Sequence, residues 1–153
     1  MHRSNDWRSV FDKTDPVERD ELRECHVKKM GIEARLARAE LARIPVDWGY
    51  ECVADALECG YAMLDFEIPA VAAWLTIAGD RIREGALEGE QSWALNKERD
   101  LWKAEKAMTV ERWSFWESRL IELQGKSATV SDAASVAYAE CVICRLSGLG
   151  REG

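Results

Sequence analysis

The chain has 153 residues, a length that suits one domain with a core large enough to fold without disulfides or metal. Hydrophobic residues make up 47% and charged residues 32% of it, which is typical of a globular chain rather than a disordered one. With 28 acidic and 21 basic side chains the formal net charge is −7, and this balance argues against non-specific binding to nucleic acid or anionic membrane.

The sequence shows no targeting or membrane-spanning signal. Its first residues contain no apolar run of the kind found in secretory signals. The most apolar stretch, residues 68–79, is too short to cross a bilayer. We therefore expect a soluble, cytoplasmic protein with no membrane span.

The N-terminal half predicts two helices after a peripheral segment, residues 1–13. This segment could itself contain a short helix that packs on the rest of the fold through Trp7. Asp15, Pro16 and Glu18 form a strong helix start, and Pro45 should end that helix. Its expected buried stripe is Val27, Met30, Ala34, Ala37 and Leu41, widened by Leu22, Cys25, Ile32 and Leu36, with Glu33 outside. A second helix is expected from Asp47 to about Leu64, buried through Val53, Ala56, Leu57, Gly60 and Leu64, with a neighbouring helix packed closely at Gly60.

A third helix is expected to begin at Pro69 and to stop at Gly85. Its stripe is Val71, Trp74, Leu75, Ala78 and Ile82. Residues 86–108 have no clean helical period, so we expect a connector pinned to the surface by Trp93 and Trp102.

Residues 109–123 give the clearest helical signal. Thr109 suits the N-cap, Glu111 the first turn and Gly125 the position after the end. Trp113, Trp116, Leu120 and Leu123 fall at spacings of three, four and three, which places them on one face. A last helix should begin at Ser131, end at Gly148 or Gly150, and bury Val136, Ala139, Ile143 and Leu146. No strand pattern occurs, so the expected fold is an all-α, single-domain irregular bundle of about five to seven helices over residues 1–153.

Three fragments in order resemble a family of uncharacterised fungal helical proteins, a domain of unknown function. They are Ala56-Leu57-Glu58, AVAAWLTIAGDRI at 70–82 and MTVERWSFWESRL at 108–120. The R-W-x-F-W-x-x-R block is the most specific part, with Leu120 where the family commonly has Phe. The resemblance implies a fungal source and a helical fold, and it supplies no catalytic residues.

Five cysteines without a signal peptide argue against a disulfide framework. Cys141-x-x-Cys144 could be half of a zinc site or a redox pair, but no second closely spaced pair accompanies it, so buried core cysteines are the favoured interpretation. His26 could serve a Cys–His nucleophile, yet its neighbour Cys25 points about 100° away on a helix, and a half-buried histidine is favoured. The terminal G-x-G-x-x-G follows a helix rather than a strand and is discarded. We expect neither metal nor cofactor.

The ionisable candidates lie near the tryptophan-bearing helices. Asp80, Glu117 and Tyr138 are the candidate acid–base groups. Arg112 and Arg119 could bind an anion or carbonyl, or pair with a carboxylate that orients these helices, although exposed ion pairs of little energetic value are the favoured interpretation.

Seven tryptophans are the unusual feature of the composition. They are either core and anchoring residues or the lining of an apolar cavity formed by Trp74, Trp102, Trp113 and Trp116.

Two functional hypotheses follow. The first is a small cofactor-independent protein of fungal secondary metabolism that binds an apolar ligand in a tryptophan-lined cavity and, if it is an enzyme, cyclises or isomerises it. The second is a non-enzymatic interaction module, a homodimer or a binder of a helical protein, that uses an exposed aromatic face.

Overall fold

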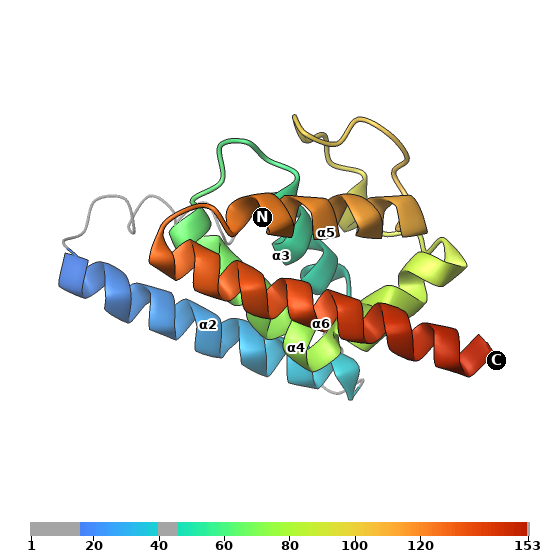
Figure 1. Cartoon of the computed structure of the whole chain (residues 1–153), viewed down its shortest axis with the longest axis horizontal. Coiled ribbons are helices and arrows are strands. Elements are labelled where there is room, and N and C mark those ends of the chain that lie inside the picture. The colour runs from blue at the N-terminus through green and yellow to red at the C-terminus, as the bar shows by residue number, and fades with distance from the viewer. Residues whose placement is uncertain (1–15, 40–45, 153) are drawn as a thin grey trace.

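The fold is a bundle of helices. The computed structural model describes residues 16–39 and 46–152 (Figure 1). Within these residues there is no strand, only one isolated bridge between Arg99 and Trp102. The expected all-α, single-domain fold is confirmed. Its elements are α2 (Pro16–Arg38), α3 (Asp47–Leu57), α4 (Leu64–Glu88), the 3-10 turn η1 (Trp93–Leu95), α5 (Val110–Leu123) and α6 (Ala128–Glu152).

Helix α4 is the centre of the bundle. Its most extensive contacts are with α6 and α2, which lie along it, while α5 packs on α6 and α3 packs on α4. The connector between α4 and α5 returns over α3, at the top of Figure 1. Residues far apart in the sequence therefore meet where α3, α5 and the connector come together.

The predicted core residues of α4 and α5 are confirmed. Trp74, Trp113 and Trp116 are fully buried in one hydrophobic cluster, and the rings of the last two lie 6.5 Å apart between centroids. The α4 stripe is buried as expected: Val71, Trp74, Leu75, Ala78 and Ile82. The Thr109 hydroxyl accepts a hydrogen bond from the Arg112 amide at 3.1 Å, so Thr109 is the N-cap of α5.

Helix α4 is longer than predicted at both ends. It begins at Leu64, so the prediction that Pro69 opens it is wrong. Proline has no N–H for the carbonyl four residues earlier, and Arg23 of α2 replaces that donor with a bond from Nε to the Asp65 carbonyl at 2.8 Å. The predicted stop at Gly85 is also wrong, because Gly85 is buried inside the helix and Gly89, with φ 68°, ends it.

Helix α3 is shorter than predicted. It ends at Leu57 rather than near Leu64. Gly60 is exposed in the turn that follows, and its amide donates to Asp100 Oδ1 at 2.9 Å. The close neighbour at Gly60 is therefore the connector and not a helix, which corrects that prediction.

Helix α2 buries part of its predicted stripe. Met30, Ala34 and Ala37 are buried, but Cys25 and Ile32 are exposed. Glu33, expected outside, is buried. The predictions for the peripheral segment 1–13, for Leu41 and for Pro45 fall outside the described residues.

Helix α6 buries the opposite face from the predicted one. Val136, Ala139, Ile143 and Leu146 are exposed, and the helix extends from Ala128 to Glu152 past the predicted ends at Ser131, Gly148 and Gly150. Helix α6 is apolar on two faces, so the periodicity alone did not identify the one that packs on α4. The face that packs consists of Val130, Ala134, Ala137, Cys141 and Cys144.

Candidate functional site

Glu58, the residue directly after α3, lies in a buried polar site against α5. Its two oxygens accept bonds from Arg112, Nε to Oε2 and Nη2 to Oε1, both at 2.7 Å. Trp116 Nε1 donates to Oε2 as well, at 2.7 Å. The Glu58 side chain is 0% and the Arg112 side chain 1% exposed, so this is a fully desolvated bidentate ion pair.

A second buried pair adjoins the first. Arg99 of the connector donates to Asp55 Oδ1 of α3, from Nε at 3.2 Å and Nη2 at 2.9 Å. Its Nη1 lies 3.8 Å from Glu58 Oε1, and Lys97 reaches Asp55 at 3.3 Å. We call Asp55, Glu58, Arg99 and Arg112 the buried ion cluster.

The connector folds over this cluster. Arg112 Nη1 donates to the carbonyls of Glu105 at 3.1 Å and Ala107 at 3.4 Å. Trp102 donates from Nε1 to the same Glu105 carbonyl at 2.8 Å, and the Arg112 guanidinium carbon lies 5.5 Å from the Trp102 ring centroid. Trp102 of the connector therefore contacts Arg112 of α5. Trp93 does not anchor the connector, because it is 54% exposed and Ala94 and Leu95 are buried in its place.

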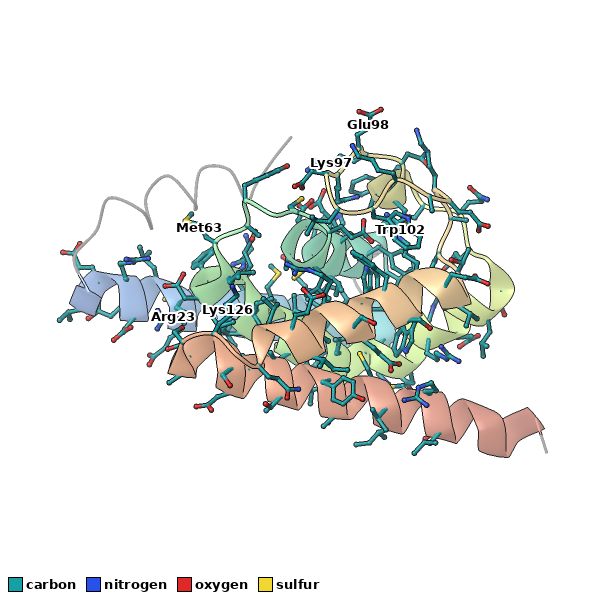
Figure 2. All side chains as sticks on the ribbon, turned by 45° about the horizontal axis from the view of Figure 1, so that its top comes forward. Arg23, Met63, Lys97, Glu98, Trp102 and Lys126 are labelled. Atoms are coloured by element: carbon teal, nitrogen blue, oxygen red, sulfur yellow. The ribbon has the colours of Figure 1, made fainter. Side chains whose placement is uncertain are left out.

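A small pocket opens between the connector and the buried ion cluster. Its volume is about 100 Å³, and it is lined by Arg99, Arg112, Trp102 and the polar side chains around them, including Lys97 and Glu98. Figure 2 shows Lys97 and Glu98 at the outer end of the connector and Trp102 nearer α5. Pockets for drug-sized ligands are several times larger, so this one suits a few waters or a small polar group.

An apolar groove runs between α2 and α4. Its volume is about 360 Å³, it is open to solvent, and no tryptophan lines it. The lining residues are Val27, Lys28, Gly31, Ile32, Arg35, Ala73 and Ile77.

Asp80, a predicted acid–base residue, lies at a kink in α4. Ala78 has non-helical backbone angles there, φ −126° and ψ 18°. Asp80 Oδ1 accepts from the Arg81 amide at 2.9 Å, and Arg38 bridges Asp80 Oδ2 and the Ile77 carbonyl, both at 3.0 Å. These bonds tie Asp80 and Arg38 to the backbone of α4 beside the kink.

Glu117 and Tyr138, the other predicted acid–base residues, lie near the α5–α6 contact. Glu117 accepts from Trp113 Nε1 at 2.6 Å and from Arg145 of α6 at 3.1 Å. Tyr138 is half-buried on α6 and packs against the core. Neither residue lines the pocket or the groove described above.

The predicted ligand-binding residues are only partly brought together. Trp102 and Arg112 share the small pocket, while Trp74, Trp113 and Trp116 line neither of the two described cavities. Arg119 donates to the Leu57 carbonyl at 3.0 Å and pairs with Glu122. The expectation of exposed ion pairs is wrong for Arg112, because its partner is the buried Glu58 directly after α3.

The described structure also contains polar groups that sequence inspection missed. Arg83 is buried, with its guanidinium carbon 5.4 Å from the Trp113 ring centroid, and among the described residues its Nε and Nη1 have no hydrogen-bond partner. Trp74 Nε1 is likewise buried without a partner. Arg99 stands in a connector without periodicity, so no signal in the sequence marked it as buried.

The cysteines are free thiols, and the structure buries Cys59, Cys141 and Cys144. Burial raises the pKa of Cys141 above the usual range and that of Cys144 to about 11, so both stay protonated near neutrality. His26 is half-buried, with its ring stacked on Phe66 at 4.3 Å between centroids. Among the described residues, no three His, Cys, Asp or Glu side chains are grouped so that they could hold a metal ion.

Comparison with known families identifies the chain. Residues 4–120 match the model of a family described as protein of unknown function (DUF3632). The match covers more than half of the sequence, so the chain belongs to this family. It includes both halves of the buried ion cluster and ends before α6.

Other comparisons add no relative. No curated protein and no solved structure matches the chain. Within the part that the structure describes, none of the helices is long and apolar enough to cross a membrane.

Proposed function

We propose that this protein is a non-enzymatic helical interaction module whose docking surface is the outer face of α6. We call Val136, Ala139, Ile143 and Leu146 the outer stripe. Its three larger members are 50%, 55% and 55% exposed, in chain order. At about 100° per residue these four positions lie opposite the face that packs on α4 and α5.

The spacing of the outer stripe supports docking rather than scattered exposure. Single exposed aliphatic residues are ordinary on protein surfaces, whereas contiguous apolar patches mark interaction sites. Steps of three, four and three correspond to the a and d positions of a coiled-coil seam, with Val136 and Ile143 at a and Leu146 at d. This seam is the single observation that carries the proposal.

The buried ion cluster has a structural role. Both Glu58 oxygens are occupied by Arg112 and Trp116, and the two arginines are held by carboxylates and backbone carbonyls. A general acid or base needs a proton position within reach of a substrate, and these groups present none. The cluster instead fixes α3, α5 and the connector to one another.

Titration of isotope-labelled protein with a synthetic helical peptide that carries Ile and Leu at its a and d positions tests the proposal. We expect backbone amide shifts concentrated on α6 and their loss in Ile143→Ser. Ile121→Ser is the matched control, because Ile121 is 51% exposed on α5 and belongs neither to the outer stripe nor to the two described cavities. Shifts that persist in Ile143→Ser, or that appear only outside α6, would contradict the proposal.

The apolar-ligand hypothesis stays a prediction. The α2–α4 groove is the described cavity whose size and apolar lining suit such a ligand. Quenching of tryptophan fluorescence by apolar metabolites would support a site near the tryptophans. Shifts confined to the amides of Gly31, Ala73 and Ile77 would place the ligand in the groove instead.

A further inference from the structure

We infer that the partner docked on the outer stripe is a second copy of this chain, with the two α6 helices antiparallel; this inference rests on the proposed function. Positions 136 and 146 are equally distant from residue 141, and so are positions 139 and 143. A two-fold axis passing beside residue 141 therefore brings each stripe residue opposite another stripe residue. Such an interface uses the same patch on both copies and closes after two.

The side-chain volumes favour this arrangement. In the antiparallel pair Ala139, the smallest member, lies opposite Ile143 of the second copy, and Val136 lies opposite Leu146 of the second copy. All four layers then combine a smaller with a larger side chain, as close packing requires. A parallel pair suits Val136 and Ile143 at a and Leu146 at d, but it sets alanine against alanine and leaves a gap in the centre.

The surroundings of the outer stripe allow two copies to approach. Ser135, Val142 and Ser147 flank it, so few charges are buried by self-association. Two carboxylates are exceptions. Asp132 is exposed on the same face, one turn before Val136, and Glu140 lies beside the centre, where it faces the same residue of the second copy across the axis. Association brings together two chains that each carry a net charge of −7. The like-charge repulsion between them should be strongest at Glu140.

The seam extends over two heptads, which is short compared with the roughly 1,600 Å² buried in standard interfaces. We therefore expect a weak, reversible dimer. Sedimentation equilibrium of the full chain over a wide concentration range should show this dimer. Ile143→Ser should weaken it by at least about tenfold, because it removes buried apolar area twice per dimer. Ile121→Ser should leave it unchanged, and Glu140→Gln should tighten it.

A photo-activated benzophenone amino acid at position 139 tests the orientation. In a mixture of isotope-labelled and unlabelled chains, we expect cross-links from position 139 to residues near 143 of the other copy. Links to position 139 of the other copy, or no links between copies at concentrations where the dimer forms, would overturn the inference. An unchanged unfolding midpoint checks that each variant folds, and Leu146→Ser repeats the test at a second position.

The two proposals fail in different ways. If the chain stays monomeric at all concentrations but still binds the heptad peptide on α6, the inference of a dimer is wrong and the proposed interaction module is still supported. If Ile143→Ser does not weaken the dimer, the inference is wrong. If Ile143→Ser also does not weaken peptide binding, the proposed function is wrong as well.

Discussion

Glu58 and Arg112 are 54 positions apart in the sequence, yet their side chains are joined by two hydrogen bonds of 2.7 Å with both groups removed from water. The pair connects the end of α3 to the first turn of α5. Trp116 and the folded connector complete its surroundings. Two residues of the fragments that resemble the family thus form the polar centre of the domain.

Arg112→Met should destabilise the protein by about 3–5 kcal/mol, because it leaves the Glu58 carboxylate buried without its partner. Arg83→Met is the matched comparison, since Arg83 is also buried but lacks a carboxylate partner. Its replacement should change the stability by less than about 1 kcal/mol. Urea denaturation measures both variants, and equal losses would contradict the importance of the pair.

Gly85→Ala should destabilise the fold although alanine favours helices. A Cβ at Gly85 would lie 1.9 Å from the Tyr50 hydroxyl and 2.6 Å from Glu90 Oε1. We expect a loss of about 1–3 kcal/mol, partly recovered when Tyr50→Phe is added. Gly31→Ala is the control, because the nearest atom lies at 3.7 Å and the substitution should stabilise by about 0.5–1 kcal/mol. Equal effects at the two glycines would refute the close approach of Tyr50.

Asp80→Ala should lower the stability by about 1 kcal/mol, because it removes hydrogen bonds that the carboxylate accepts beside the kink in α4. The carboxylate accepts from the Arg81 amide through Oδ1 and from Arg38 through Oδ2. Thermal unfolding measures the loss, and Glu84→Ala, at an exposed position on the same helix, serves as the control. A variant as stable as the control would show that Asp80 does not stabilise the kink.

Glu90 should make the stability depend on pH. Burial acts to raise the pKa of Glu90, but hydrogen bonds from Arg81 and Tyr50 outweigh it and lower that pKa. A carboxyl with a lowered pKa stabilises the folded state above its unfolded pKa of about 4.3, and this contribution is lost as the pH falls through the folded pKa. The difference in unfolding free energy between wild type and Glu90→Gln should therefore be largest above pH about 5 and shrink toward pH about 3. A difference that stays constant across this range would contradict the assignment, and Glu88→Gln is the exposed control.

The cysteines should differ sharply in reactivity. Cys25 is exposed, whereas burial raises the pKa of Cys144 to about 11 and keeps that thiol protonated. Iodoacetamide at pH 8 should label Cys25 within minutes and Cys144 only at the rate of unfolding. Mass spectrometry of the labelled peptides tests the order. Rapid labelling of Cys144 in native protein would show that α6 opens from α4.

The sequence alone was sufficient for the secondary structure class and for much of the core. Helical spacing identified the buried faces of α4 and α5, and the Thr109 cap fixed where α5 begins. These features depend on residues within a few turns of one another, so local patterns carry them. The ends of α4 could not be obtained in this way, because Arg23 of another helix compensates for Pro69.

Only the tertiary structure decided the polar site and the free surface. Periodicity groups residues onto a face but does not say which face meets a neighbour, so the stripe of α6 that was predicted to be buried is the exposed one. In the sequence, Arg99 and Arg112 resemble ordinary surface charges. In the folded chain they are buried and paired with Asp55 and Glu58. The burial of a charge depends on partners distant in the sequence, and the packing of the whole chain determines which partners those are.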